Sequence, residues 1–515
     1  MRRARFRWWP LLLGPAVIVP HAFGAPGDSI FAGLQAHTVA IDFSQPAYWD
    51  SLTQYYDDGL EQYMAARVTV DGVPYDSVGV RLKGNASYTH PNLKKPFRLS
   101  FDEYRDAQRW DGLKGVHLNN CWEDPTFIRE KLHLDYCRDA GIPAPRGNFA
   151  TLTLNGELWG LYSLVEHVDR TFLSSRYGNN DGNLYKAVDG FLNPMISDFK
   201  WYGSDPSLYH NRYELRTDNP TNPWTDLVHV IDLLNNSPNL ATALPPVIDL
   251  ESVYHALATD NLLASFDSYA GSGRNFYCYF NPTIGQMEWT VWDAGMSFGS
   301  FWGSGTNYET ASITFVSNAA NRPLASKIFA TPALRQQYYQ AYGSLFTTFF
   351  SEANLFPQID AIANLIRPHV YADPRKMYTN TQFEQNIVSD ITVGGHRKPG
   401  LKSFIPLRVA NVASQLSVVS VAFEETPATP AELAMTVPNP FPRGAKIGYG
   451  IIAEGPVTLR VFDPQGRLTA MLVDRELAPG THWAAFATER LPPGMYFCRL
   501  ESGGLVAARK LLIVD

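Results

Sequence analysis

The residues with the greatest capacity for chemistry are two aspartates and an asparagine in the middle of the 515-residue chain: Asp267, Asn275 and Asp293. Two carboxylates and an amide offer a cation oxygen ligands only, and such ligands favour Mg²⁺ or Mn²⁺ over zinc. A carboxylate that does not hold a metal is able to accept a proton from a reacting hydroxyl. The pattern therefore predicts a divalent-metal site with a separate proton acceptor. The alternative is that these residues cap loop turns.

A hairpin is expected to bring these residues together. Residues 276–280 read as a strand, followed by a turn and a returning strand that ends at Trp292. If Phe280 pairs with Met287, the register places Asn275 opposite Trp292, at the open end of the hairpin. The loop aspartate before the hairpin and the aspartate after it then lie at that same end.

A basic strand pair nearer the N-terminus forms a second candidate site. Arg81 and Lys83 share one face of a strand, a Gly-Asn-Ala-Ser turn ends at Ser87, and Lys95 leads into the next strand. Cations beside such a turn can hold phosphate oxygens, helped by turn amides. The GxxxxGK[ST] loop is absent, so this is not a P-loop. The alternative is an ordinary solvated strand face.

A helix expected from 124–125 to Gly141 carries Glu130 within an otherwise apolar sector. A carboxylate on the buried side needs a partner, and a nearby lysine is the simplest one. The alternative is a boundary glutamate that reaches water. A hairpin with an Asn-Gly turn at 155–156 follows, and its second strand passes into a helix through a hinge around Glu166.

Composition limits the classes of function. The chain has 43 Lys and Arg against 50 Asp and Glu and no block of basic residues, so neither nucleic acid nor an anionic membrane is an expected partner. At 45% hydrophobic residues it is long enough to bury a large core. The four cysteines lack metal-ligand spacing and are expected to be buried thiols.

The chain divides unevenly. Residues 1–25 combine four arginines, a short apolar run and small residues, which is typical of a cleaved secretory signal. We expect one large domain over 26–423, a Pro- and Glu-rich linker over 424–432, and a small β-sandwich over 433–515. The protein is therefore expected in the periplasm, at the cell surface or outside the cell, without a transmembrane segment after signal cleavage.

The last segment resembles a known type of domain. NPFPRGAKIGYGI, VTLRVFDPQGRLTAMLV and LPPGMYFCRL are similar to the FlgD-like, Ig-type C-terminal domain, relatives of which serve as type IX secretion sorting signals. The resemblance implies that this part addresses or attaches the protein. The implied partner is secretion machinery or the cell surface.

The large domain resembles the spore-coat protein H (CotH) family of atypical kinases. The similar stretches are VGVRLKGNAS, KKPFRLSF, IREKLHLDYCRDAGIPAP, LNGELWGLYSLVEHVDRTFL, NLYK, FDSYAGSGRNFYCYF, WDAGMSFG and the closing motif KPGLKSF with Arg408. The order of parts also matches a protein kinase: phosphate-binding lysine, helix glutamate, hinge, catalytic aspartate with asparagine, and metal aspartate. The resemblance implies an α+β, bilobal kinase-like fold that uses ATP and Mg²⁺ or Mn²⁺ to phosphorylate protein Ser or Thr hydroxyls.

The resemblance also implies roles for single residues. Asp267 is implied to be the catalytic aspartate and Asp293 the metal ligand, and Asn275 is implied to act with both, in the catalytic pair and as a second metal ligand. The residues placed near the nucleotide are Arg81, Lys83, Ser87, Lys95, Glu130 and Glu166.

One departure from the family pattern leaves alternatives open. The family usually reads W-D-x-D in the metal strand, whereas this chain has Gly295 in place of the second acid. A non-catalytic pseudokinase that serves in surface adhesion or matrix binding is therefore the alternative to an active kinase. A metal-dependent hydrolase of envelope polymers is a third reading of the same acids.

Overall fold

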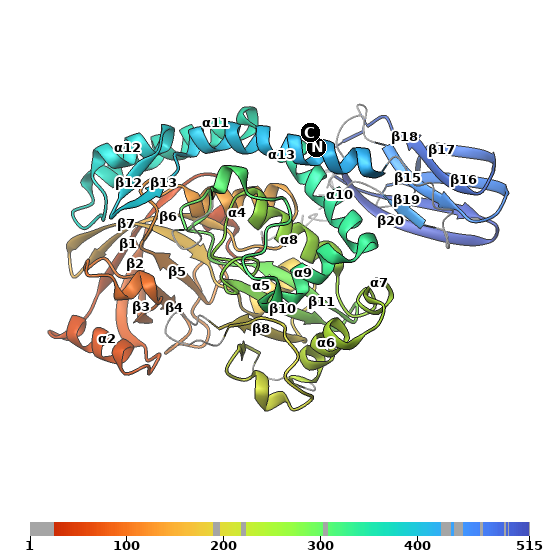
Figure 1. Cartoon of the computed structure of the whole chain (residues 1–515). Coiled ribbons are helices and arrows are strands. Elements are labelled where there is room, and N and C mark those ends of the chain that lie inside the picture. The colour runs from red at the N-terminus through yellow and green to blue at the C-terminus, as the bar shows by residue number, and fades with distance from the viewer. Residues whose placement is uncertain are drawn as a thin grey trace, which may run out of the picture.

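The computed structural model describes residues 25–188, 196–217, 223–301, 307–423, 434–436, 446–463, 467–488, 491–492 and 494–513. The expected signal, apart from Ala25, and the expected linker 424–432 lie outside the described residues. Figure 1 shows a β-barrel on one side, a mixed helical part in the middle, and a separate group of strands at the opposite side. The mixed α+β fold class predicted from the sequence is confirmed.

Seven strands close into the barrel, in the order β1 (Ala36–Asp42), β2 (Met64–Val70), β3 (Val73–Leu82), β4 (Phe97–Ser100), β5 (Gly115–Asn119), β7 (Glu157–Glu166) and β6 (Gly147–Leu154). The expected alternation holds, because Val78, Val80 and Leu82 of β3 point into the barrel core. Closure depends on a parallel pairing of β1 with β6. Local sequence pattern did not predict this pairing between strands far apart in the chain.

The helix expected from 124–125 is α4 (Arg129–Asp139), so the predicted start was wrong by four residues. The N-cap is Ile128 rather than Asp124, whose carboxylate accepts hydrogen bonds from the backbone N–H of Thr126 at 2.9 Å and of Arg129 at 2.8 Å. Phe127 has φ of 59°, a left-handed conformation that helical residues do not adopt. The segment before Arg129 therefore forms turns rather than a first helical turn.

A second sheet and most of the helices make up the middle of the molecule (Figure 1). The sheet has the order β11 (Gln286–Val291), β10 (Phe276–Asn281), β8 (Asn183–Ala187) and β9 (Tyr213–Leu215). A short two-stranded sheet pairs β12 (Ile391–Val393) with β13 (His396–Lys398). The longer helices besides α4 are α2 (Tyr48–Asp57), α5 (Arg170–Tyr177), α6 (Thr225–Asn236), α8 (Leu250–Leu262), α9 (Pro323–Ala330), α10 (Pro332–Phe349), α11 (Glu352–Ala372), α12 (Asn380–Val388) and α13 (Leu401–Phe423).

The barrel and the middle part share a wall. Along β7, Tyr162 and Leu164 belong to the barrel core, whereas Leu161 and Val165 belong to the core of the middle part. Helix α4 packs in this second core and is buried from Arg129 to Cys137. A strand that is apolar on both faces joins two layers of structure, so barrel and middle part form one packed body.

The C-terminal part has its own buried cluster. Its sheets have the orders β14 (Ala434–Thr436), β15 (Lys446–Ile451), β18 (Gly480–Ala485) and β17 (Leu468–Leu477), β16 (Gly455–Phe462), β19 (Gly494–Ser502), β20 (Leu505–Ile513). Every element described after Phe423 is a strand, as the sequence predicted for this part.

Two further predictions concern the chain as a whole. The four cysteines are free and buried, as their spacing predicted. Among the described residues, none of the helices combines the length and apolar character needed to span a bilayer.

Candidate functional site

The hairpin β10–β11 has the predicted register, because Phe280 pairs with Met287. Asn275 and Asp293 therefore flank its open end directly. Both have left-handed backbones, with φ of 58° and 54°. Non-glycine residues hold this conformation at a cost, and such residues cluster at functional sites.

Asn275 fixes the loop that carries Asp267. Its side-chain amide Nδ2 donates to the backbone O of Asp267 at 2.7 Å and to its carboxylate Oδ2 at 3.1 Å. The loop is closed further by the N–H of Gly273, which donates to the carbonyl of Ser268 at 3.0 Å. The predicted pairing of a loop aspartate with the hairpin asparagine is thus present as a direct contact.

Lys83 and Glu130 meet through an asparagine that the sequence analysis did not identify. The Lys83 ammonium donates to Oδ1 of Asn119 at 2.6 Å, and Nδ2 of the same amide donates to Glu130 Oε1 at 2.8 Å. Glu130 is 6% exposed and lies in the first turn of α4. The amide thereby links a lysine and a glutamate in one partly buried group without a direct contact between their charges.

The negative charge of Asp293 also changes the pKa values of Lys83 and Glu130. Burial lowers the pKa of Lys83, and the charges of Asp293 and then Glu130 act against that shift. Burial raises the pKa of Glu130 to about 7, with Asp293 adding to the rise and Lys83 opposing it. The Lys83 ammonium also lies 5.9 Å from the ring centroid of Trp292. Two carboxylates compete for one lysine, and such perturbed groups mark functional sites.

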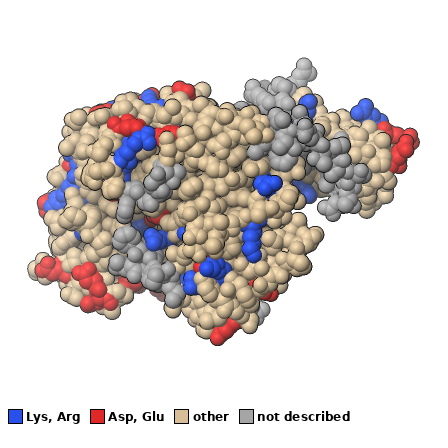
Figure 2. Space-filling view, viewed as in Figure 1, with Lys and Arg blue, Asp and Glu red and all other residues tan. Residues whose placement is uncertain are grey.

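Arg81 lies beside this group. Its guanidinium is 3.4 Å from Glu61 and packs over the ring of Tyr63, and its charge contributes to the lowered pKa of Lys83. Figure 2 shows basic side chains spread singly over the middle of the face drawn, and acidic side chains gathered over the region of α2.

Ser87 lies in the neighbouring turn, α3 (Ala86–Thr89), and Lys95 lies in the segment between α3 and β4. The Lys95 ammonium donates to the carbonyls of Tyr88, at 2.5 Å, and of His90. The carbonyl of Ser87 accepts from Nδ2 of Asn120 at 2.9 Å, so this turn is tied to the residue after Asn119.

Glu166, which was predicted to lie near the nucleotide, is paired with two arginines. It is 1% exposed, and its carboxylate accepts from Arg146 Nη2 at 2.7 Å and from Arg176 Nη2 at 2.8 Å. A ligand would have to displace one of these arginines. The position at the end of β7 agrees with the prediction, but the carboxylate holds β6 and α5 together.

The residues at the hairpin suit a magnesium ion that a nucleotide helps to hold. Among the described residues there is no group of three or more His, Cys, Asp or Glu side chains placed to hold a metal. Mg²⁺ is commonly bound by one or two carboxylates plus substrate phosphates rather than by a cage of protein ligands. Asp293 and Asn275 offer such a partial set of oxygen ligands.

Asn119 could have been found from one signal. The sequence HLNN places two consecutive amides at the end of an apolar strand, and buried amides need partners. Which partners they have depends on the position of β5 between β4 and β7, which the sequence alone does not supply.

Comparisons with known proteins identify the family of the chain. Residues 80–392 match the family described as CotH kinase protein. The inner spore coat protein H of Bacillus subtilis (strain 168) is 25% identical over 295 residues, which cover 57% of this chain and 78% of that protein. Invasin CotH7 of Rhizopus delemar is 21% identical over 328 residues, covering 60% of this chain and 53% of the relative.

A solved structure, the twitchin kinase region from C. elegans (Fn31-NL-kin-CRD-Ig26), overlaps 81% of this chain and 70% of its own at 9% identity. Its TM-score of 0.15 is too low to carry a structural argument. The family match is different in kind, since it spans well over half of the chain and contains the residues from Arg81 to Asp293 that form the site. The chain therefore belongs to the CotH kinase protein family.

Proposed function

We propose that this chain is an exported protein kinase that transfers the γ-phosphoryl group of ATP to Ser or Thr hydroxyls of a protein. The observation that supports this most is the meeting of Lys83, Glu130 and Asp293, which come from three distant segments. Phosphoryl transfer needs little covalent help from a protein and depends on positioning and charge neutralisation.

Each residue has a role in this proposal. Asp267 accepts the proton of the acceptor hydroxyl, and Asn275 orients the Asp267 carboxylate. Asp293, with Asn275, would hold Mg²⁺ or Mn²⁺, which supplies neutralisation of phosphate charge when it is bound. Lys83 and Arg81 bind phosphate oxygens, and Glu130 keeps Lys83 in place through its shared amide partner.

Ser87 in α3 and Lys95 in the segment that follows it are proposed to line the phosphate end of the site. Their present contacts are with backbone groups of that turn and with Asn120. Glu166 is proposed to support the hinge between β7 and α5 rather than to touch the nucleotide, because two arginines occupy its carboxylate.

The test is incubation of the mature protein with labelled ATP, Mg²⁺ or Mn²⁺, and a Ser-rich protein acceptor. We expect transfer of label to the acceptor and a rise in melting temperature with ATP and metal. No transfer together with no nucleotide-dependent stabilisation would rule out the kinase. Transfer that survives Asp293→Ala would leave the activity and refute the site.

A non-catalytic surface protein is the second candidate, and Gly295 is the observation that favours it. A site with one fewer carboxylate binds a divalent cation more weakly. One relative is named an invasin and another a spore coat protein, which suits a role at a surface. Binding to a cell-surface glycan or protein without nucleotide would support this candidate.

Export and sorting belong to the same proposal. We infer that residues 1–25 direct secretion and that residues 433–515, beyond the linker 424–432, form an Ig-type domain read by secretion machinery or held at the cell surface. Removal of 433–515 should leave kinase activity unchanged and change where the protein is found. Unchanged localisation would refute the sorting role.

A further inference from the structure

The closing segment, residues 397–408, has no part in the reaction described so far. It runs from β13 into α13 and lies beyond residue 392, where the family match ends. Its side chains and carbonyls nevertheless contact three separate stretches of chain, and each stretch leads directly to one of the proposed site residues Glu130, Asp293 and Asp267.

The first contact is made by Lys398, whose side chain is 2% exposed. Its ammonium forms an ion pair with the Glu123 carboxylate and donates to the carbonyl of Ser300 at 2.7 Å. The hydroxyl of Ser300 donates back to the carbonyl of Glu123. The buried Lys398 side chain thereby joins the segment before α4 to the segment that follows Asp293.

The second contact is made by the backbone of Pro399. Its carbonyl accepts from Nη2 of Arg129 at 2.6 Å, and Arg129 is fully buried and immediately precedes Glu130. The same guanidinium holds Asp124 at 2.6 Å. The hydroxyl of Ser297 donates to the carbonyl of Arg129 at 3.3 Å, which adds another bond between α4 and the segment after Asp293.

The third contact is made by Arg408, which is also fully buried. Its Nη2 donates to the carbonyl of Asn261 at 3.1 Å and its Nε to that of Leu262 at 3.4 Å. These carbonyls end α8, just before the loop that carries Asp267. The N–H of Phe298 donates to the next carbonyl, that of Leu263, at 2.5 Å.

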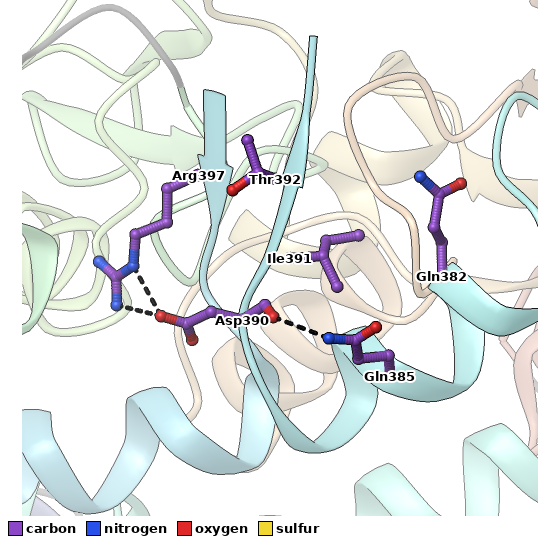
Figure 3. Close-up of a pocket in the computed structure, with 6 residues that line it drawn as sticks. All are labelled: Gln382, Gln385, Asp390, Ile391, Thr392 and Arg397. Atoms are coloured by element: carbon purple, nitrogen blue, oxygen red, sulfur yellow. Dashed lines mark hydrogen bonds and ion pairs between the residues drawn. The ribbon is translucent and has the colours of Figure 1, made fainter. Parts of the chain in front are cut away.

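The closing segment is itself held firmly. Figure 3 shows the side chain of Asp390 reaching Arg397, and Gln385 reaching the backbone of Asp390. The same Asp390 carboxylate accepts from the N–H of Gly400 at 2.9 Å and from Ser403 Oγ at 2.9 Å. The hairpin β12–β13 and the start of α13 therefore form one rigid support.

We propose that Lys398 is a positioning residue for phosphoryl transfer, which fixes the segment after Asp293 against the start of α4 and so sets Asp293 relative to Lys83 and Glu130. This inference rests on the proposed function. Groups that orient a site without touching substrate control its geometry, and a displacement of about 1 Å costs roughly 100-fold in rate.

The kinetic test compares Lys398→Met with Lys402→Met. Lys402 belongs to the same motif and also pairs with a carboxylate, Asp360 at 2.6 Å, but on α11 and away from the site. At a temperature where both variants are folded, Lys398→Met should lower kcat roughly 10- to 100-fold and change KM for ATP by less than about threefold. Lys398→Arg should recover part of the loss.

Hydrogen exchange gives a second readout that needs no activity. The backbone N–H groups of Phe298 and Gly299 donate to the carbonyls of Leu263 and Ala264. Lys398→Met should speed exchange at these amides at least tenfold, whereas Lys402→Met should not. If the wild type transfers no phosphate and is not stabilised by ATP with Mg²⁺, the proposed function fails, and exchange then decides only whether Lys398 anchors the segment after Asp293.

Two results would refute the positioning role of Lys398. Equal kcat and equal exchange in Lys398→Met and Lys402→Met would refute the inference. If Lys398→Met does not fold, Glu123→Gln is the substitute, because it removes the partner charge from a position whose side chain is 18% exposed. An unchanged kcat and unchanged exchange in Glu123→Gln would refute the inference in the same way.

Discussion

Two buried glutamates in different regions of the molecule have opposite electrical surroundings. Glu130 in α4 shares a neutral amide with a lysine and faces a second carboxylate, and burial raises its pKa to about 7. Glu166 at the end of β7 is bound by Arg146 and Arg176. A carboxylate that is fully paired holds a fold together, whereas one left short of positive charge is poised to respond to a ligand.

Burial and residue type therefore do not by themselves define a site. Both glutamates are buried, and both were predicted to lie near the nucleotide. What separates them is the supply of positive charge within hydrogen-bond reach. Substitutions should therefore affect rate in the first region and stability in the second.

The largest effect is expected from substitution of Asp293, the second carboxylate that acts on Glu130. Asp293→Asn should reduce phosphoryl transfer roughly 1,000-fold or more, because several kcal/mol of charge stabilisation in the transition state is lost with the metal ligand. Asp293 is exposed, so the melting temperature should change little. Labelled-ATP transfer measures the loss.

Asp106→Asn is the matched control, because it makes the same chemical change at an exposed loop aspartate away from the site. Its transfer rate should equal that of the wild type. A loss of transfer in both variants would point to a general effect of charge and would contradict the assigned role of Asp293.

The second prediction concerns Glu166. Glu166→Gln leaves two arginines facing a neutral amide in a buried position, which should cost about 3–5 kcal/mol of stability. Denaturant unfolding measures this cost. Glu130→Gln should show the reverse pattern, with kcat down roughly 10- to 100-fold and little loss of stability at neutral pH. A larger stability loss in Glu130→Gln than in Glu166→Gln would contradict the roles assigned to the two glutamates.

The sequence alone predicts those features of the site that depend on local strand pairing. The register of β10–β11 follows from strand pattern and turn length, so the placement of Asn275 and Asp293 was predictable. The role of Asn119 was not, because it depends on which strands neighbour β5 in a closed barrel.

Ion pairs between residues far apart in the chain could not be predicted from the sequence either. Arg146 and Arg176 lie on either side of Glu166 in sequence, and the pattern gave no reason to pair both with it. Lys398 meets Glu123 across 275 residues, which only tertiary packing determines. Helix α4 began later than predicted because the Asp124 carboxylate capped turns rather than a helix.

The third prediction concerns the pH dependence of stability that Glu130 causes. Glu130 has a pKa of about 7 in the folded protein against an ordinary 4.5. Between these values the folded state holds a proton that the unfolded state has released, so stability falls as pH rises from 4.5 through 7, by up to about 1.4 kcal/mol per pH unit. Below and above that window this group contributes no slope.

The measurement is the difference in unfolding free energy between wild type and Glu130→Gln at pH 5, 6, 7 and 8. Taking the difference removes the contribution of other carboxyls with raised pKa values, such as that of Glu288. In Asp293→Asn the window should end at a lower pH, because the Asp293 charge raises the pKa of Glu130. A difference that does not vary with pH would contradict the assigned environment of Glu130.

The smallest effect is expected from restoring the acid that this chain lacks. A Cβ at Gly295 would meet Asp293 Oδ1 at 3.9 Å and no other neighbouring atom within 4 Å, so an aspartate fits. Gly295→Asp places a second carboxylate beside the first, and the extra oxygen ligand should raise the affinity for Mn²⁺ in the presence of ATP about tenfold. Without metal the two like charges repel, so the gain must appear only on titration with Mn²⁺. Gly295→Asn has nearly the same size without the charge and should gain much less. Equal Mn²⁺ affinity in all three proteins would show that a second acid at position 295 is not a ligand in this fold, and that the metal is held without it by Asp293, Asn275 and the nucleotide phosphates.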